Sequence, residues 1–527
     1  CDDLFDTIKN YFNDTRKVVR LGNTRDAAYK ADYRCSTFTR LRETEPIVVI
    51  ATVQLFIKGT LRPELFDLAS MGHISCIAFD ECQEIANSGE NTGSFQSDFR
   101  SLGDLLRPHD CRCKEGNTVC NCFAFQSVPM LLTSATCNMY VQKRCTEILH
   151  LGRLKTNDGN DTNLNPAISE DGLGVAEPNS KLVCFEQPAY RENLEYIVES
   201  RLAKNSKMDT EQAKKRVKSI LEDLPASEFA IVFCLKPKTV KMLHKYLLTC
   251  PKLKNKITLS HGNTEMLSKT EASKNESLWR TGKKTIMISN NKFSLGIDKK
   301  NVRLVIQYAL PPNLDDYIQA SGRAGRDVKP SKCILLYRYN DIFTAQRTTD
   351  HSATEMEKLR NKDSRRLLIS YCLDAQTCRH RLMDMALHSG RSRQQEAERC
   401  LCDNCNQSRS IRDLTVCVNR LLCSIVNDEL SKIKWKEAEL RHLWKIEINT
   451  TIRESFQKTA NDAFYSVLLC LTSLDILTRS GRGSAYFYTK GERFETYMGA
   501  FQDTAGAFVI KTNLETEGGS SATGKTV

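Results

Sequence analysis

Short apolar runs that end in polar or glycine-rich positions recur through most of the chain. They occupy residues 47–51, 73–79, 229–234, 286–288 and 302–308. Runs of this length, bounded by turn residues, are typical of buried strands in a parallel sheet. A strongly basic stretch at 204–223 has the pattern of a helix. The hydrophobic pattern therefore predicts an α/β protein.

The flanking segments have different patterns. Residues 1–23 predict an amphipathic helix leading into a strand at 18–21, and residues 156–180 are polar and without period, as in a linker. Amphipathic helical pattern occupies 414–452. A further helix is expected after residue 460, followed by a hairpin with aromatic and basic residues at 485–492, and this order fits a winged helix. An α/β cap without DNA contact is the alternative.

Composition narrows the class of partner and the compartment. Among the 527 residues, 76 Lys and Arg oppose 64 Asp and Glu, a net charge of +12, which favours a polyanionic partner. No apolar run of membrane-spanning length and no signal peptide is apparent, so we expect a soluble intracellular protein. In such a chain, 22 cysteines indicate buried thiols and zinc. The first residue, Cys1, indicates a fragment.

Two clusters of charged residues point to phosphoryl transfer. An apolar strand ending in Asp80 and Glu81 would place one carboxylate on Mg²⁺ and the other beside the attacking water. Arg323 and Arg326, three residues apart in a glycine-containing loop, suit a polyphosphate whose charge develops during transfer. An Arg-Gly segment alone would more often be a solvated loop or an RNA-binding tail.

The loop around these arginines, Q-A-S-G-R-A-G-R-D at 319–327, resembles the sixth motif of the RecQ family of superfamily-two helicases. The resemblance implies two RecA-like domains and an ATP cleft. It implies that Gln319, Gly322, Arg323 and Arg326 face that cleft, with one arginine acting as the arginine finger. ATP and Mg²⁺ are the implied cofactors.

Further stretches resemble other motifs of this family. D-E-C-Q at 80–83 resembles the DEAH-like second motif, with Gln83 where histidine is usual; a relay there would work by hydrogen bonding. L-L-T-S-A-T at 131–136 is similar to the third motif, which assigns Ser134 and Thr136 to the nucleotide site. The stretch 289–299 resembles the fifth, in which Gly296 and Asp298 would couple nucleotide to DNA. R-x-N-L-x-Y at 191–196 resembles the entry to the second RecA-like domain.

The departures from the motifs leave two functions open. The resemblance implies ATP-driven 3′→5′ unwinding of DNA in repair or recombination, in the nucleus. Gln83 and the polar residues at 290–294 instead suit a non-catalytic DNA-binding or scaffolding protein derived from RecQ. The aromatic loop that senses single-stranded DNA in the family is matched only at its end, 97–100.

Separated cysteines predict metal binding. A cysteine at 378 and a knuckle at 400–405 offer soft ligands for structural zinc and resemble the RecQ zinc module; the predicted ligands are Cys378, Cys400, Cys402 and Cys405. His388 is an alternative fourth ligand. A second pair of C-x-C motifs, Cys111, Cys113, Cys120 and Cys122, could equally bind zinc or be free thiols.

The tail contains Gly519–Thr526, which fits the phosphate-loop pattern G-x-x-x-x-G-K-[ST]. A working loop needs a preceding strand and a following helix, and in the family it would precede Cys1. We therefore expect either a chance match in a Gly/Ser-rich tail or the start of a truncated second module, rather than a working site. We expect the chain on its own to bind DNA without useful ATP hydrolysis. The predicted divisions are a first helicase domain at 1–155, a linker at 156–180, a second helicase domain at 181–345, a zinc module at 346–410, a winged-helix-like domain at 411–512 and a tail at 513–527.

Overall fold

The computed structural model describes a large part of the chain. The residues described are 18–21, 48–51, 53–57, 62–86, 99, 101–107, 124–125, 128–151, 153–155, 161–163, 167–168, 183–184, 190–200, 206–262, 265, 267–290, 299–351, 353, 355–374, 376–388, 400–406, 410–428, 434–451, 463–480, 487–499 and 509–512. Among these residues, none of the helices combines the length and apolar character that a membrane span requires.

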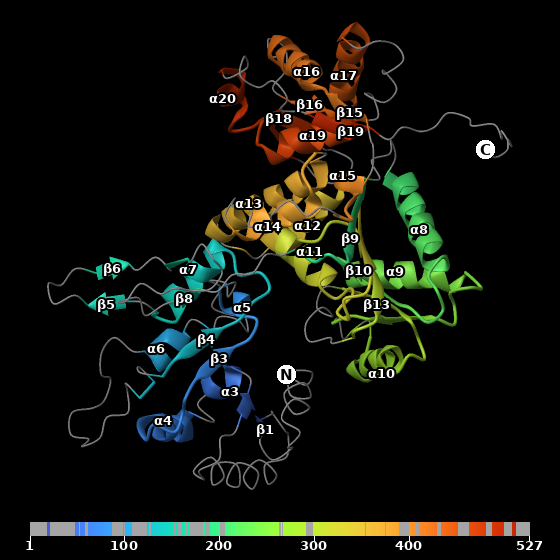
Figure 1. Ribbon diagram of the computed structural model, residues 1–527. Coiled ribbons are helices and arrows are strands. Elements are labelled where there is room, and N and C mark those ends of the chain that lie inside the picture. Colours follow the sequence, from blue (N-terminus) through green and yellow to red (C-terminus); the bar gives the residue numbers. More distant parts are fainter. Residues whose placement is uncertain are drawn as a thin grey trace, which may run out of the picture.

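A six-stranded parallel sheet forms the centre of the second domain (Figure 1). Its strands, in spatial order, are Ile257–Ser260 (β11), Ile286–Asn290 (β12), Phe229–Cys234 (β10), Val302–Tyr308 (β13), Ser331–Tyr337 (β14) and Leu194–Ser200 (β9). Every residue of β10, β11 and β12 is buried, as expected for strands covered on both faces. The α/β class predicted from the apolar runs is confirmed here.

Helices cover this sheet and begin where local sequence favours them. They are Ser206–Glu222 (α8), Pro237–Leu248 (α9), Lys269–Arg280 (α10) and Leu314–Ser321 (α11). α8 is the helix expected from the basic stretch at 204–223. α10 starts with a capping box between Ser268 and Glu271, and α11 starts with the Asn313 side chain accepting a bond from the Asp316 N–H.

The first domain, residues 18–151, is built from shorter elements. They are Val18–Leu21 (β1), Val48–Ala51 (β2), Val53–Ile57 (α3), Arg62–Ser70 (α4), Ile77–Phe79 (β3), Gln83–Ala86 (α5), Leu102–Leu106 (α6), Met130–Leu132 (β4) and Met139–Ile148 (α7). β1 pairs with β2 and β3 with β4, both in parallel. One buried cluster, which includes Ile85, Leu106 and Val141, packs beneath β3 and β4.

The stretch expected to be a linker, 156–180, contributes one strand to each of two short strand pairs. Arg153–Lys155 (β5) pairs with Asp161–Asn163 (β6), and Ala167–Ile168 (β7) pairs with Val183–Cys184 (β8). Polar sequences without period can form such pairs because backbone groups supply the hydrogen bonds.

Beyond the second domain lies a helical region with Asp341–Asp350 (α12), Glu355–Leu373 (α13), Arg379–Leu387 (α14) and Asp403–Asn406 (α15). The C-terminal module follows, with Ser410–Asp413 (β15), Thr415–Asp428 (α16), Trp435–Lys436 (β16), Glu437–Thr451 (α17), Phe464–Ser473 (α19), Leu477–Ser480 (β17), Phe487–Lys490 (β18), Phe494–Gly499 (α20) and Val509–Thr512 (β19). β17 and β18 form a hairpin, of which only β18 lies in the expected segment 485–492; the first strand lies earlier, at 477–480. β16 adds a third antiparallel strand. Assignment as a winged helix remains a prediction.

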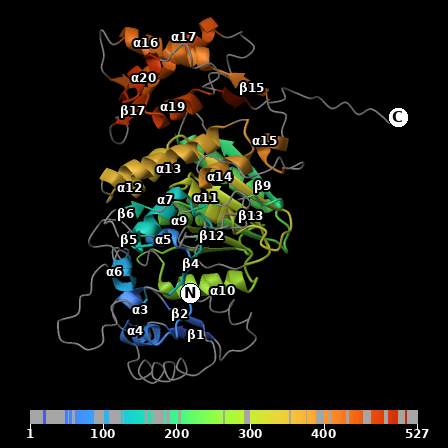
Figure 2. The ribbon, with the colours of Figure 1, turned by 60° about the vertical axis from the view of Figure 1, so that its left-hand side comes forward.

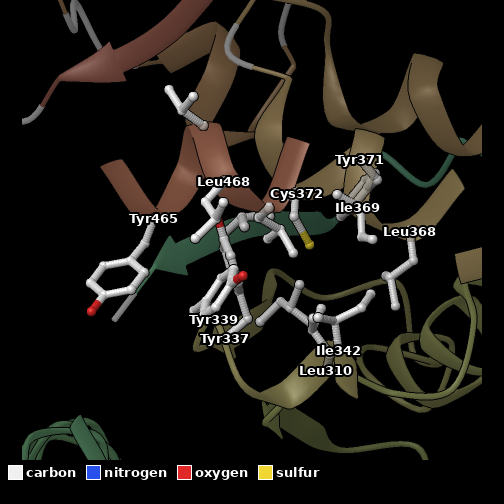
Figure 3. Packing of buried hydrophobic residues seen from close by; sticks show 14 of the residues in the cluster. Leu310, Tyr337, Tyr339, Ile342, Leu368, Ile369, Tyr371, Cys372, Tyr465 and Leu468 are labelled. Carbon is white, nitrogen blue, oxygen red and sulfur yellow. The ribbon is translucent and has the colours of Figure 1, made fainter. Parts of the chain in front are cut away.

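One continuous core joins these parts. Figure 3 shows its centre, where Tyr339, which follows β14, and Ile342 of α12 meet Cys372 of α13 and Leu468 of α19. The Tyr339 hydroxyl lies 2.7 Å from that of Tyr488 on β18. The second domain, the helical region and the C-terminal module are therefore packed as one body, with α13 running between them (Figure 2).

Candidate functional site

The acidic pair predicted to carry catalysis lies at the end of β3. Asp80 is exposed, and its Oδ1 accepts a bond of 2.9 Å from Thr133 Oγ1, at the end of the neighbouring strand β4. Glu81 has a φ of +55°, in the left-handed region that residues other than glycine rarely adopt. Such backbone strain is concentrated at functional sites. The parallel pairing of β3 with β4 therefore brings both carboxylates beside the third motif.

Gln83 links the second and third motifs through its side-chain amide. Its Nε2 donates to Glu81 Oε2 at 2.7 Å, and its Oε1 accepts from Ser134 Oγ at 2.5 Å. Ser134 Oγ in turn accepts from the Thr136 N–H at 3.0 Å. The amide is buried and uses both a donor and an acceptor. It therefore forms the hydrogen-bonded relay that the sequence suggested for this position, without a titratable group.

Two contacts carry this network across to the second domain. Gln319 Nε2 of α11 donates to Thr136 Oγ1 at 3.3 Å. Asn138 Nδ2, from the residue that caps α7, donates to Asp315 Oδ2 at 3.2 Å. Motif residues more than 180 positions apart in the chain thus meet, and α11 spans the boundary between the domains.

The arginine loop begins where α11 ends. Gly322 is the C-cap of that helix. The Arg323 side chain is buried, whereas Arg326 is exposed. Asp327 pairs with Arg303 of β13, and this pairing lowers the pKa of the Asp327 carboxyl. The loop is therefore anchored at both ends, with a different environment for each arginine.

Arg191 and Asn193 hold the same loop from the side. Arg191 Nη2 donates to the Gly325 carbonyl at 2.6 Å, and Asn193 Nδ2 donates to that oxygen at 2.8 Å. Gly325 has a φ of +54°, and a Cβ there would lie 2.4 Å from Asn193 Nδ2. From the sequence, the R-x-N spacing predicts only the start of the second domain. Its role in holding the Gly325 carbonyl is not predicted, because that role depends on the pairing of β9 with β14.

Burial changes the acidity of two carboxyls at the start of α11. Withdrawal from water raises the pKa of Asp315 to about 6. It raises the pKa of Asp316 to about 7, and the negative charges of Asp315 and of Glu84 on α5 add to this effect. The boundary between the domains is therefore sensitive to charge.

Some predicted site residues cannot be placed. Gly296 and Asp298 of the fifth motif lie outside the described residues, as do Cys111, Cys113, Cys120 and Cys122. The Gly519–Thr526 match and most of the 97–100 stretch also lie there. Ser289 is described, buried at the end of β12, with its Oγ donating to the Ser260 carbonyl at 2.6 Å.

The cysteine cluster is assembled as the spacing suggested. One sulfur atom from each of Cys378, Cys400, Cys402 and Cys405 lies within 4.8 Å of the others. The sulfurs of Cys378 and Cys400 are 3.3 Å apart, and those of Cys378 and Cys402 are 4.0 Å apart. Tetrahedral zinc with bonds of about 2.3 Å needs sulfurs about 3.8 Å apart. The donor set and its size therefore fit a structural zinc ion.

The alternative ligand lies elsewhere. His388 Nδ1 contacts the carbonyl and the carboxylate of Asp384, at 2.9 and 3.0 Å. His380 instead lies beside the cluster, with Nδ1 3.2 Å from Cys400 Sγ. Hydrogen bonds from Cys378, then from Cys400, lower the pKa of the Cys402 thiol. Hydrogen bonds with Cys378 and Cys402 raise the pKa of the Cys400 thiol in turn.

The cysteine knuckle at 400–406 is attached to the sheet of the second domain. Asp403 of α15 forms a buried ion pair of 2.8 Å with Arg379, and its other oxygen accepts from the Val198 N–H at 3.2 Å. Val198 belongs to β9, the edge strand. A metal at the cluster would therefore stabilise the sheet edge as well as its own module.

Comparison with known proteins gives the same family as the motifs. The model of the helicase conserved C-terminal domain matches residues 212–328. A putative ATP-dependent DNA helicase Q1 of Caenorhabditis elegans is 30% identical over 310 residues, covering 59% of this chain and 39% of the worm protein. The ATP-dependent DNA helicase Q-like 2 of Arabidopsis thaliana is 24% identical, covering 74% of this chain and 49% of its own.

Among solved structures, the DUF1998 helicase MrfA bound to DNA and AMPPNP has a TM-score of 0.44 at 14% identity. The match covers 66% of this chain and 42% of that one. The chain spans less than half the length of the two curated relatives described above. The resemblance read from the motifs is confirmed: over the matched residues this chain is similar to ATP-dependent DNA helicases of the RecQ type.

Proposed function

We propose that this chain is part of an ATP-dependent DNA helicase of the RecQ type, unwinding duplex DNA in the 3′→5′ direction during repair or recombination in the nucleus. The observation that carries the proposal is the unbroken series of contacts from Glu81 through Gln83, Ser134 and Thr136 to Gln319. It joins the carboxylate beside the attacking water to the helix that precedes the arginine loop. Such a path suits an enzyme in which phosphoryl transfer and domain movement are coupled.

Each residue has a role in this proposal. Asp80 would hold Mg²⁺, since its carboxylate is exposed and Thr133 fixes one oxygen. Glu81 would orient and deprotonate the attacking water, with Gln83 fixing its carboxylate. Exposed Arg326 is better placed than buried Arg323 to reach the transferred phosphoryl group. The metal supplies charge neutralisation when it is bound.

The scaffold alternative is less well supported. It rests on the substitution at Gln83 and on polar residues in the fifth motif. Gln83, however, keeps both hydrogen bonds that a relay needs. The named relatives on which the family assignment rests are ATP-dependent DNA helicases.

Glu81→Gln tests the catalytic role. In the full-length protein, this change should abolish DNA-stimulated phosphate release and leave binding of Mg²⁺·ATP within about two-fold, because it removes the base and not the metal ligand. Phosphate release and equilibrium binding of a fluorescent ATP analogue are the measurements. Glu147→Gln, on the exposed Arg144–Glu147 pair, is the matched control and should leave both unchanged. Undiminished turnover in Glu81→Gln would exclude the assignment.

A further inference from the structure

Helix α13 touches the first domain on one face and the C-terminal module on the other. Arg360 lies near its N-terminus, and its guanidinium is 5.0 Å from the centre of the Tyr140 ring on α7 while hydrogen-bonding the Tyr140 hydroxyl. The same hydroxyl lies 3.5 Å from the carbonyl of Ala86, the last residue of the second-motif helix α5. Figures 1 and 2 both place the start of α13 beside α7.

The opposite face of α13 contacts the C-terminal module. Lys362 Nζ lies 2.7 Å from Asp475 Oδ2, and Arg366 pairs with the same oxygen. Arg366 Nε also donates to the Ser473 carbonyl at 2.8 Å. At about 100° per residue, these two residues lie about 200° and 240° around the helix from Arg360. One rigid helix therefore carries the two sets of contacts on opposing faces.

Asp475 occupies the turn that fixes both ends of the β17–β18 hairpin. It precedes β17, has a φ of +58°, and its carbonyl accepts from the Arg493 N–H at 3.1 Å just after β18. Gly491 passes so close that a Cβ would lie 2.0 Å from the Asp475 carbonyl oxygen. Movement of α13 would consequently be passed to the hairpin as a whole.

We infer that Arg360 is a positioning residue, through which the approach of the first domain sets the position of α13 and thereby of the hairpin. The inference rests on the proposed function, because it supplies a link from the nucleotide cleft to a module expected to contact DNA. The Gln319–Thr136 and Asn138–Asp315 contacts close the cleft, and the Tyr140–Arg360 contact adds a third point at the edge of the same boundary. The path from α5 to the hairpin then runs through Tyr140, α13 and Asp475.

Hydrogen–deuterium exchange of the full chain tests this inference without requiring ATP hydrolysis. Arg360→Ala should raise exchange by about two- to five-fold, the equivalent of one cation–π contact. The increase should appear in the first turn of α7 and also in strands β17 and β18 of the C-terminal module. Lys358→Ala is the matched control, because Lys358 lies on the same helix and pairs only locally with Glu355. It should leave both regions unchanged.

Two further variants distinguish loss of the Arg360–Tyr140 contact from a general destabilisation of α13. Tyr140→Leu removes the same contact from the other side and should reproduce the pattern, while Arg360→Lys should restore part of the protection. Increased exchange confined to α13, or no increase at all, overturns the inference. Either result leaves the catalytic proposal intact, since that proposal depends on the behaviour of Glu81→Gln.

Discussion

Single residues in strained or crowded positions define the arginine loop. Gly325 has both features, with a left-handed backbone and no space for a Cβ beside Asn193. Gly325→Ala should lower the free energy of unfolding of the second domain by about 1–3 kcal/mol, because an alanine must accept the strained φ and displace Asn193. Urea denaturation followed by tryptophan fluorescence measures this change, since Trp279 is buried in the same domain.

Gly322→Ala is the control for that experiment. Gly322 has an ordinary helical φ of −60° and would meet only the carbonyls of its own helix, the nearer at 3.2 Å. Its effect on unfolding should be clearly smaller. Equal effects from the two substitutions would show that the backbone of Gly325 is not what holds the loop.

At the scale of elements, the start of α11 places two half-buried carboxyls, those of Asp315 and Asp316, at the domain boundary. Because the pKa of Asp316 is raised to about 7, the folded state holds this proton more tightly than the unfolded chain. The contribution of the protonated Asp316 carboxyl to the stability of the folded state is complete below about pH 4. It is lost as the pH rises through about 7. Asp316→Asn should therefore stabilise the protein at pH 8 more than at pH 5, as measured by thermal unfolding. Asp315→Asn should act in the same direction more weakly, and a pH-independent effect would contradict the burial argument.

The zinc knuckle is a second element with a testable role. Purified protein should carry about one zinc ion per chain, and Cys402→Ser should remove it and lower the midpoint of thermal unfolding, because structural zinc contributes several kcal/mol to small modules. Elemental analysis gives the metal content. Cys76→Ser, which changes an exposed cysteine outside the cluster, should alter neither quantity. A Cys402→Ser protein that keeps its metal would exclude the cluster as the site.

For the whole molecule, the excess of 12 positive charges is spread over several modules that share one core. Binding to DNA should therefore weaken strongly as the salt concentration rises. For each tenfold rise in salt, the logarithm of the association constant should fall by about 0.9 for every phosphate that the protein neutralises. Fluorescence anisotropy with a labelled duplex carrying a 3′ single strand measures this slope. Circular dichroism across the same salt range controls for unfolding, and an affinity independent of salt would contradict a polyanion site.

The sequence alone determined the features that depend on neighbouring residues. Runs such as 229–234 and 302–308 specified β10 and β13, because an apolar run bounded by turn residues is stable only as a buried strand here. The spacing of Cys402 and Cys405 predicted that their sulfurs lie close together, and single motifs such as that at 319–327 predicted the likeness to RecQ-type helicases. Each of these signals is carried within a short stretch of chain.

Only the tertiary structure decided which distant residues meet. The packing of α14 against the knuckle decided that Cys400 and not His388 lies beside the other three cysteines. The contact of Arg191 with Gly325 depended on β9 pairing with β14. The contacts of α13 with both the first domain and the C-terminal module exist because these two parts pack against opposite faces of the helix. Sheet order and helix packing follow from the total burial of apolar surface, a property of the whole chain that local spacing does not contain.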